Sequence, residues 1–179
     1  MLNNKTIAVV VPCYNEETQI EMVVETMPQF VDRIVIVNDN STDNTKNIVL
    51  ELIASGEYLS QTDIVKHKVN PSFYNKADQV LQEENDKEIF KFTPQENLSQ
   101  NNNSKIVLIQ HTINSGVGAA IASGYKWCKD HQIYCTAVMA GDGQMDPSEL
   151  KLICLPVIEE RIDYVKGNRL IRRSAWLVI

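Results

Sequence analysis

The stretch Val9–Glu17 reads VVVPCYNEE, and in it a run of β-branched residues stops where polar and acidic residues begin. Three later segments show the same change to polar, small or acidic residues: Val35–Asp43 (VIVNDNSTD), Asn114–Ala119 (NSGVGA) and Met139–Gln144 (MAGDGQ). Apolar runs that end in this way predict buried strands of a mostly parallel sheet. We expect their polar ends to collect beyond the carboxyl edge of the sheet, where open α/β folds bind ligands.

Helical spacing of apolar residues predicts helices between these strands. The predicted strands are residues 6–11, 33–37, 106–109 and 134–139, and the predicted helices are residues 16–27, 42–55 and 118–129. A further helix is expected after Asp146-Pro147-Ser148-Glu149, which supplies an N-cap, a first-turn proline and a capping-box glutamate. The pattern of alternating strands and helices predicts an α/β domain.

Length and composition fit one globular domain over residues 1–179, with 44% hydrophobic and 22% charged residues. The formal net charge is −6, and Lys and Arg form no track for a phosphate backbone, so nucleic acid is not expected as a partner. Four irregularly spaced cysteines and three scattered histidines indicate neither a zinc site nor a disulfide framework. With no apolar run long enough for a membrane span, we expect a soluble, cytoplasmic protein with reduced thiols.

A polar insertion occupies about residues 60–104 and ends in the low-complexity stretch SQNNNS. We expect a partly mobile excursion with a short helix near residues 77–84. A tolerated surface insertion is favoured over a role in acceptor recognition.

Taken in order, the four segments resemble the nucleotide-sugar-binding half of family 2 glycosyltransferases of the GT-A fold, especially the dolichol-phosphate and polyprenol-phosphate sugar synthases. The resemblance implies a Rossmann-like, mostly parallel sheet flanked by helices. It also implies an inverting, metal-dependent transfer of a sugar from a UDP- or GDP-sugar, with Mn²⁺ or Mg²⁺ as cofactor. The implied acceptor is a polyprenyl phosphate or a glycan at the cytoplasmic face of the membrane.

By this resemblance, Pro12, Tyr14 and Glu16 line the nucleoside pocket. Asn38 and Asp39, also assigned to donor binding by the resemblance, stand where the family usually carries two successive acids. Asp39 could accept hydrogen bonds from the ribose hydroxyls or the base, and Asn38 keeps hydrogen-bonding capacity without the charge. The alternative is that the first segment only starts a helix with acidic residues, and that the second only forms a turn and cap.

The resemblance also assigns donor contacts to Asn114, Gly116 and Gly118, whose loop would let backbone approach the nucleotide. Arg169, in a Gly-x-Arg corner, would meet the donor phosphate. The alternatives are close packing of helix on sheet for the glycines and a solvated surface charge for Arg169. A nicotinamide-dependent oxidoreductase is a further reading, although the third glycine of a dinucleotide fingerprint is missing.

The metal motif of the family has two acids separated by one residue, and here Ala140 takes the place of the first acid. Asp142 keeps the second place, and Gln144 follows two residues later. In an extended segment these two side chains lie on one side, so we expect them to share a cation with diphosphate oxygens. The alternative is an acidic turn before the Asp146 cap.

No carboxylate follows Asp163, so the catalytic base of the family is not assigned to any residue. We therefore expect a C-terminally truncated or shortened donor-binding part, and the alternative function is a non-catalytic nucleotide-sugar-binding fragment. The apolar end Trp176–Ile179 is a candidate surface for self-association or for packing of further sequence.

Overall fold

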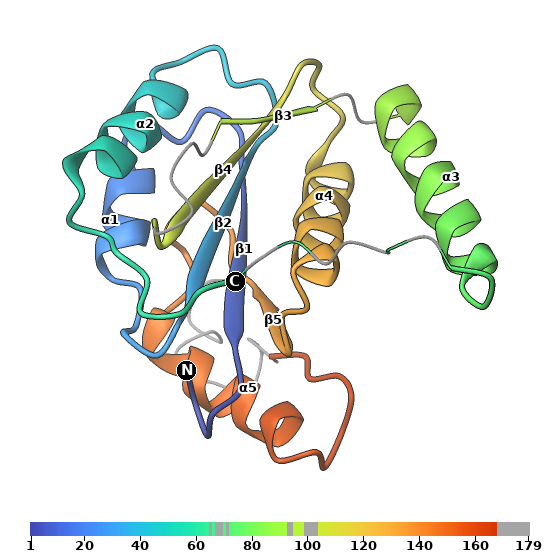
Figure 1. Ribbon diagram of the computed structural model, residues 1–179. Helices are drawn as coiled ribbons and strands as arrows, with labels where there is room; N and C mark the ends of the chain where they lie inside the picture. Colours follow the sequence, from blue (N-terminus) through green and yellow to red (C-terminus); the bar gives the residue numbers. More distant parts are fainter. Residues whose placement is uncertain (65, 67–69, 71, 93–94, 99–103, 168–179) are drawn as a thin grey trace, which may run out of the picture.

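The computed structural model describes residues 1–64, 66, 70, 72–92, 95–98 and 104–167 (Figure 1). The strands are β1 (Ile7–Cys13), β2 (Arg33–Asn38), β3 (Gln95–Asn97), β4 (Ile106–His111) and β5 (Cys135–Val138). The helices are α1 (Ile20–Glu25), α2 (Thr45–Ser55), α3 (Lys76–Phe92), α4 (Val117–Asp130), the 3₁₀ turn η1 (Pro147–Glu149) and α5 (Leu150–Ile158). The sequence-based prediction of an α/β fold is confirmed.

The strands form one sheet in the order β3-β4-β2-β1-β5. The pairs β1–β2, β1–β5 and β2–β4 are parallel, and Val10 of β1 lies opposite both Val35 of β2 and Val138 of β5. Only β3 runs antiparallel to its neighbour, β4, within the described part of the sheet. All seven residues of β1 are buried, as expected for a central parallel strand that is covered on both faces.

Two hydrophobic clusters cover the two faces of the sheet. Alternate residues of β1, beginning with Ile7, pack against α1, α2 and α5. The intervening residues Ala8 and Val10 face α4, which lies on the opposite side of the sheet (Figure 1). Gly124 of α4 makes this contact close, because a Cβ atom there would lie 2.3 Å from Cγ1 of Val10. Helix α4 is therefore positioned directly over the central strand.

Some predicted boundaries differ from the structure. Helix α1 begins at Ile20 rather than near residue 16, and β1 extends to Cys13. Helix α2 begins at Thr45 and ends at Ser55, and the left-handed residue Gly56 caps its C-terminus. The predicted cap before α5 is confirmed, since the Asp146 carboxylate accepts a hydrogen bond from the Ser148 amide at 2.9 Å.

The insertion contains more secondary structure than expected. Helix α3 has 17 residues instead of one short segment, and it lies apart from the sheet, on the same side as α4 (Figure 1). Strand β3 reads QEN and pairs with the end of β4. Its three polar residues carry no hydrophobic signal, so pattern reasoning could not find it. None of the described helices combines the length and hydrophobicity that a membrane crossing requires.

Candidate functional site at the carboxyl edge of the sheet

Four loops meet at the carboxyl edge of the sheet because β1, β2, β4 and β5 run in the same direction. They are residues 14–19, 39–44, 112–116 and 139–146. These loops contain most of the polar residues singled out from the sequence. The site is therefore built from four chain segments that are distant in sequence.

The first two loops are joined by reciprocal hydrogen bonds. The Asn15 amide donates to Ser41 Oγ at 2.9 Å, and Asn15 Oδ1 accepts from the Thr42 amide at 2.8 Å. The Glu17 amide donates to Asp43 Oδ2 at 3.0 Å. Asn15 has a φ of 58°, a left-handed conformation that asparagine tolerates better than most residues. These contacts hold residues 14–19 in a loop conformation, so α1 begins only at Ile20.

Asp43 and Thr45 extend this junction. Thr45 Oγ1 accepts from the Glu16 amide at 2.9 Å, and the Thr45 amide donates to Asp43 Oδ1 at 3.0 Å. Burial alone would raise the pKa of Asp43, but the hydrogen bonds from Thr45 and Glu17 lower that pKa below its ordinary value. Asp43 is thus held ionised as part of the frame of the site.

Asn38, predicted as a donor-binding residue, is fully buried at the end of β2. Its Nδ2 donates to Gln110 Oε1 at 2.9 Å, and its Oδ1 accepts from the Ser41 amide at 3.1 Å. Asn40, two residues further along the chain, has a φ of 58°, a left-handed conformation that asparagine adopts more readily than most residues. In this structure Asn38 shapes the second loop from within the sheet.

Asp39 connects the second and third loops, and only 3% of its surface is exposed. Its Oδ1 accepts from the Ser115 amide at 2.9 Å, and its Oδ2 accepts from the Gly116 amide at 2.6 Å. Oδ1 also lies 2.7 Å from Nδ1 of His111. The carboxylate of Asp39 therefore holds the glycine loop against the end of β2.

Glu16 and Asp142 bring two carboxylates together from the first and fourth loops. The fourth loop is tied to the end of β1 by a hydrogen bond of 3.1 Å from the Gly141 amide to the Pro12 carbonyl oxygen, and a Cβ atom at Gly141 would lie 3.5 Å from Glu16 Cγ. Burial raises the pKa of Glu16, and the negative charges of Asp142 and Asp43 raise it further. A cation between Glu16 and Asp142 would relieve this repulsion.

The fourth loop turns at Gly143, which has a φ of 70°. The Gln144 amide donates to Asp142 Oδ1 at 3.0 Å, so the segment is a turn and not the extended strand from which we expected Asp142 and Gln144 to share one side. That step of the prediction is wrong, because the turn-forming sequence Gly-Asp-Gly dominates locally. Among the described residues, no group of three His, Cys, Asp or Glu side chains is arranged to hold a metal ion.

The other predicted donor residues occupy different environments. Pro12 is buried at the end of β1, and Tyr14 is 47% exposed on the first loop. Asn114 is exposed, and its Oδ1 accepts from the Gly116 amide at 3.2 Å. Gly118 is exposed in the first turn of α4. Arg169 lies outside the described residues.

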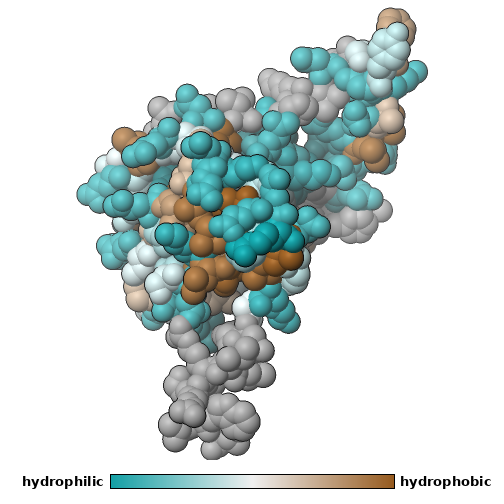
Figure 2. Space-filling model, turned by 90° about the horizontal axis from the view of Figure 1, so that it is seen from below, coloured by the Kyte–Doolittle hydropathy of each residue, from teal (hydrophilic) through white to brown (hydrophobic). Residues whose placement is uncertain are grey.

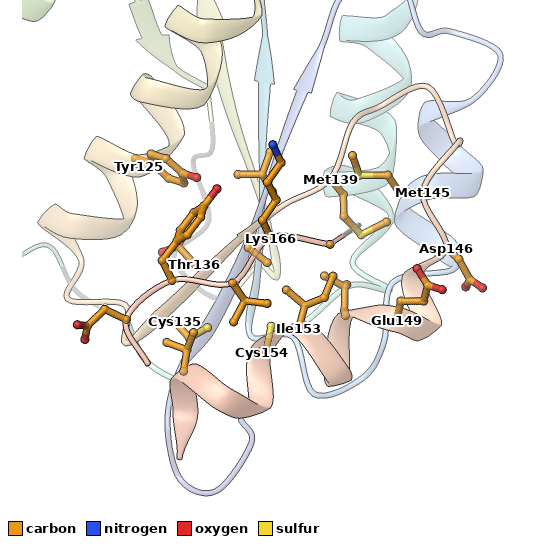
Figure 3. Close-up of a pocket in the computed structure, with 18 of the residues that line it drawn as sticks. Tyr125, Cys135, Thr136, Met139, Met145, Asp146, Glu149, Ile153, Cys154 and Lys166 are labelled. Atoms are coloured by element: carbon orange, nitrogen blue, oxygen red, sulfur yellow. The ribbon is translucent and has the colours of Figure 1, made fainter. Parts of the chain in front are cut away.

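A cavity of about 1000 Å³ adjoins this site between β5, α5 and residues 163–167 (Figure 3). Apolar side chains such as Met139 and Ile153 line it together with Lys166, and Gln144 belongs to its wall. Figure 2, which views the molecule from the end where α5 lies, shows hydrophobic residues gathered on this face. The cavity is therefore largely apolar and is continuous with the fourth loop.

Sequence reasoning missed the residues that support the site from beneath. Gln110 and His111 end the strand IVLIQH as two buried polar residues, and Ser123 faces His111 from α4. The sequence does show two polar residues at the end of an apolar strand. It does not show their hydrogen-bond partners, because these come from other elements of the fold.

Comparison with known proteins finds similarity in the chain segments that form this site. The family model "Glycosyl transferase family 2" matches residues 8–82, which include the first two loops of the site. A UDP-N-acetylglucosamine–dolichyl-phosphate N-acetylglucosaminyltransferase of Methanococcus voltae is 29% identical over 168 residues. That alignment covers 93% of this chain and 53% of the relative, so the chain spans about half the length of the relative. No solved structure matches this chain.

Proposed function

We propose that this chain is the N-terminal, donor-binding part of a family 2 glycosyltransferase, and that its loops bind a UDP-sugar together with a divalent cation. The name of the archaeal relative states a UDP-N-acetylglucosamine donor and a dolichyl-phosphate acceptor. On this basis the proposed donor is a UDP-sugar rather than a GDP-sugar. The proposed acceptor is a polyprenyl phosphate at the cytoplasmic face of a membrane.

The observation that carries the proposal is the position of Glu16 against the fourth loop, where its Cγ lies 3.5 Å from the place that a Cβ atom at Gly141, next to Asp142, would occupy. The raised pKa of Glu16 reflects its burial and the negative charge of Asp142, an arrangement that favours a cation. The carboxylates of Glu16 and Asp142 offer only oxygen ligands, which suits Mg²⁺ or Mn²⁺ better than softer metals. When bound, the cation would neutralise the charge of the diphosphate leaving group.

The remaining proposed roles concern binding of the donor. Tyr14 on the exposed first loop and Pro12 beneath it would contact the nucleoside. The glycine loop held by Asp39 would approach the nucleotide with its backbone, and Asn114 would add a polar side chain. Transfer with inversion at the anomeric carbon also needs a base, and no described residue is assigned to that role.

A second candidate function is binding of a nucleotide sugar without transfer. It is favoured by Ala140, which stands where the family carries the first acid of its metal motif. Mixing the chain with a UDP-sugar and a polyprenyl phosphate, and following the release of UDP, would separate the two functions. Release that depends on the acceptor supports transfer, whereas binding without release supports the second candidate.

The experiment that tests the proposed site compares two single substitutions, each of which removes one negative charge. Asp142→Asn removes a proposed cation ligand, and we expect it to weaken Mn²⁺-dependent UDP binding by about tenfold or more in calorimetric titration. Asp146→Asn removes the same charge from a helix cap where asparagine serves about as well, so binding is expected to stay within about twofold. Equal effects of the two substitutions would remove Asp142 from its proposed role.

A further inference from the structure

A buried chain of polar side chains runs beneath the candidate site. His111 at the end of β4 has no exposed surface and lies between two partners. Its Nδ1 is 2.7 Å from Asp39 Oδ1, and its Nε2 is 2.9 Å from Ser123 Oγ. Asp39 follows β2 and Ser123 belongs to α4, so three elements of the fold meet at one imidazole ring.

The chemistry of the partners assigns the proton at Nδ1. Both oxygens of Asp39 already accept hydrogen bonds from backbone amides, so we assign Asp39 as the acceptor and Nδ1 of His111 as the donor in the 2.7 Å contact between them. In the neutral ring, Nε2 then accepts from the hydroxyl of Ser123. The ring orientation is fixed from both sides, and Nδ1 is the donor toward Asp39.

The same carboxylate holds the glycine loop. Asp39 Oδ1 accepts from the Ser115 amide as well as from His111, and Oδ2 accepts from the Gly116 amide at 2.6 Å. Gly116 has a φ of 85° and directly precedes α4, so these two amide contacts define how the chain enters the helix. A rotation of the Asp39 carboxylate would break both contacts at once.

We propose that His111 is a positioning residue for the donor site: it fixes the Asp39 carboxylate so that loop 112–116 keeps the shape that binds the nucleotide. The inference rests on the proposed function for the nature of the ligand, whereas the coupling from His111 to the loop rests on the hydrogen bonds alone. His111 itself is fully buried and acts through Asp39.

Two substitutions at His111 separate this role from simple filling of the core. His111→Leu occupies a similar volume without a donor. His111→Asn keeps a nitrogen donor at the same number of bonds from Cα as Nδ1. Ser123→Ala is the matched control, because it removes the hydroxyl on the far side of the ring and leaves the contact with Asp39 in place.

The first readout is hydrogen exchange of the Ser115 and Gly116 amides in the protein without ligand. We expect His111→Leu to accelerate this exchange, and His111→Asn to restore most of the protection. The second readout is calorimetric UDP binding with Mn²⁺, in which His111→Leu should lose about tenfold or more in affinity. His111→Asn and Ser123→Ala should both stay within about threefold of the unsubstituted chain.

The proposal is overturned if folded His111→Leu protein keeps wild-type exchange at both amides, or if His111→Asn rescues neither readout. Should His111→Leu fail to fold, the ¹⁵N spectrum of His111 in the unsubstituted chain decides instead. A proton on Nδ1 supports the proposal, and a neutral ring with its proton on Nε2 contradicts it. If the unsubstituted chain binds no UDP, the proposed function fails, while the exchange measurements still test the coupling.

Discussion

Replacing Gly124 by alanine tests how closely α4 packs on the central strand. A Cβ atom at Gly124 would lie 2.3 Å from Cγ1 and 2.8 Å from Cγ2 of Val10, both far inside van der Waals contact. Val10 is fully buried in β1, between β2 and β5, so the surrounding structure has little room to move. Overpacking costs about 1–3 kcal/mol, and we take the upper end because the overlap is deep. Alanine returns about 1 kcal/mol of helix propensity. The expected net loss is therefore about 2 kcal/mol in the free energy of unfolding.

Urea denaturation followed by circular dichroism measures this loss, and Gly118→Ala in the same helix is the matched control. A Cβ atom at Gly118 meets nothing within 4 Å, so this substitution should be neutral or stabilise by up to about 1 kcal/mol. Val10→Ala removes both clashing methyl groups. The double variant with Gly124→Ala should therefore be more stable than the sum of the single losses predicts, by about 1 kcal/mol. A stabilising Gly124→Ala, or strict additivity in the double variant, would refute the packing argument.

Three further predictions concern the loops and the core. Asn15→Ala should lose about 1–2 kcal/mol of stability in urea denaturation, because it removes the acceptor for the Thr42 amide and places alanine in a left-handed conformation. Asn15→Gly removes the same acceptor without backbone strain and should lose less. Equal losses in the two variants would exclude strain. Hydrogen bonds lower the pKa of Asp43, so its contribution is present above the ordinary value of 3.8 and is lost as pH falls through the lowered pKa. Asp43→Asn should flatten the acid limb of a stability profile, and an unchanged limb would contradict the assignment. Burial raises the pKa of Cys128 to about 11, so alkylation followed by mass spectrometry should modify Cys128 only after unfolding; rapid labelling of the native protein would contradict its burial.

Most of the sheet could be predicted because its strands are continuous apolar runs. The segment VVVPC of β1 and the segment VIVN of β2 are buried on both faces, and their hydrophobicity alone marks them. Strand β3 could not be predicted, since QEN is polar and becomes a strand only by pairing with β4. Helix α1 begins later than its apolar spacing predicts, because the backbone amides of Asn15 and Glu17 donate hydrogen bonds to the second loop instead of starting the helix.

The candidate site was predicted at the level of its loops, and less well at the level of single side chains. Parallel strands bring their carboxyl ends together, so the convergence of the four segments followed from the pattern. The roles of individual residues depend on partners from distant segments, as Asn38 with Gln110 and Asp39 with His111 illustrate. The turn at Gly143 likewise replaced the expected extended segment at Asp142.

Calorimetric titration of UDP into this chain, with Mn²⁺ and then with excess chelator, tests the central claim most directly because it requires neither an acceptor nor a catalytic base. GDP is the matched comparison. The account predicts binding of UDP that is lost or greatly weakened when the chelator removes Mn²⁺, and weaker binding of GDP. UDP binding that is unaffected by the chelator would contradict the role of Asp142, and absence of UDP binding would contradict the donor site itself.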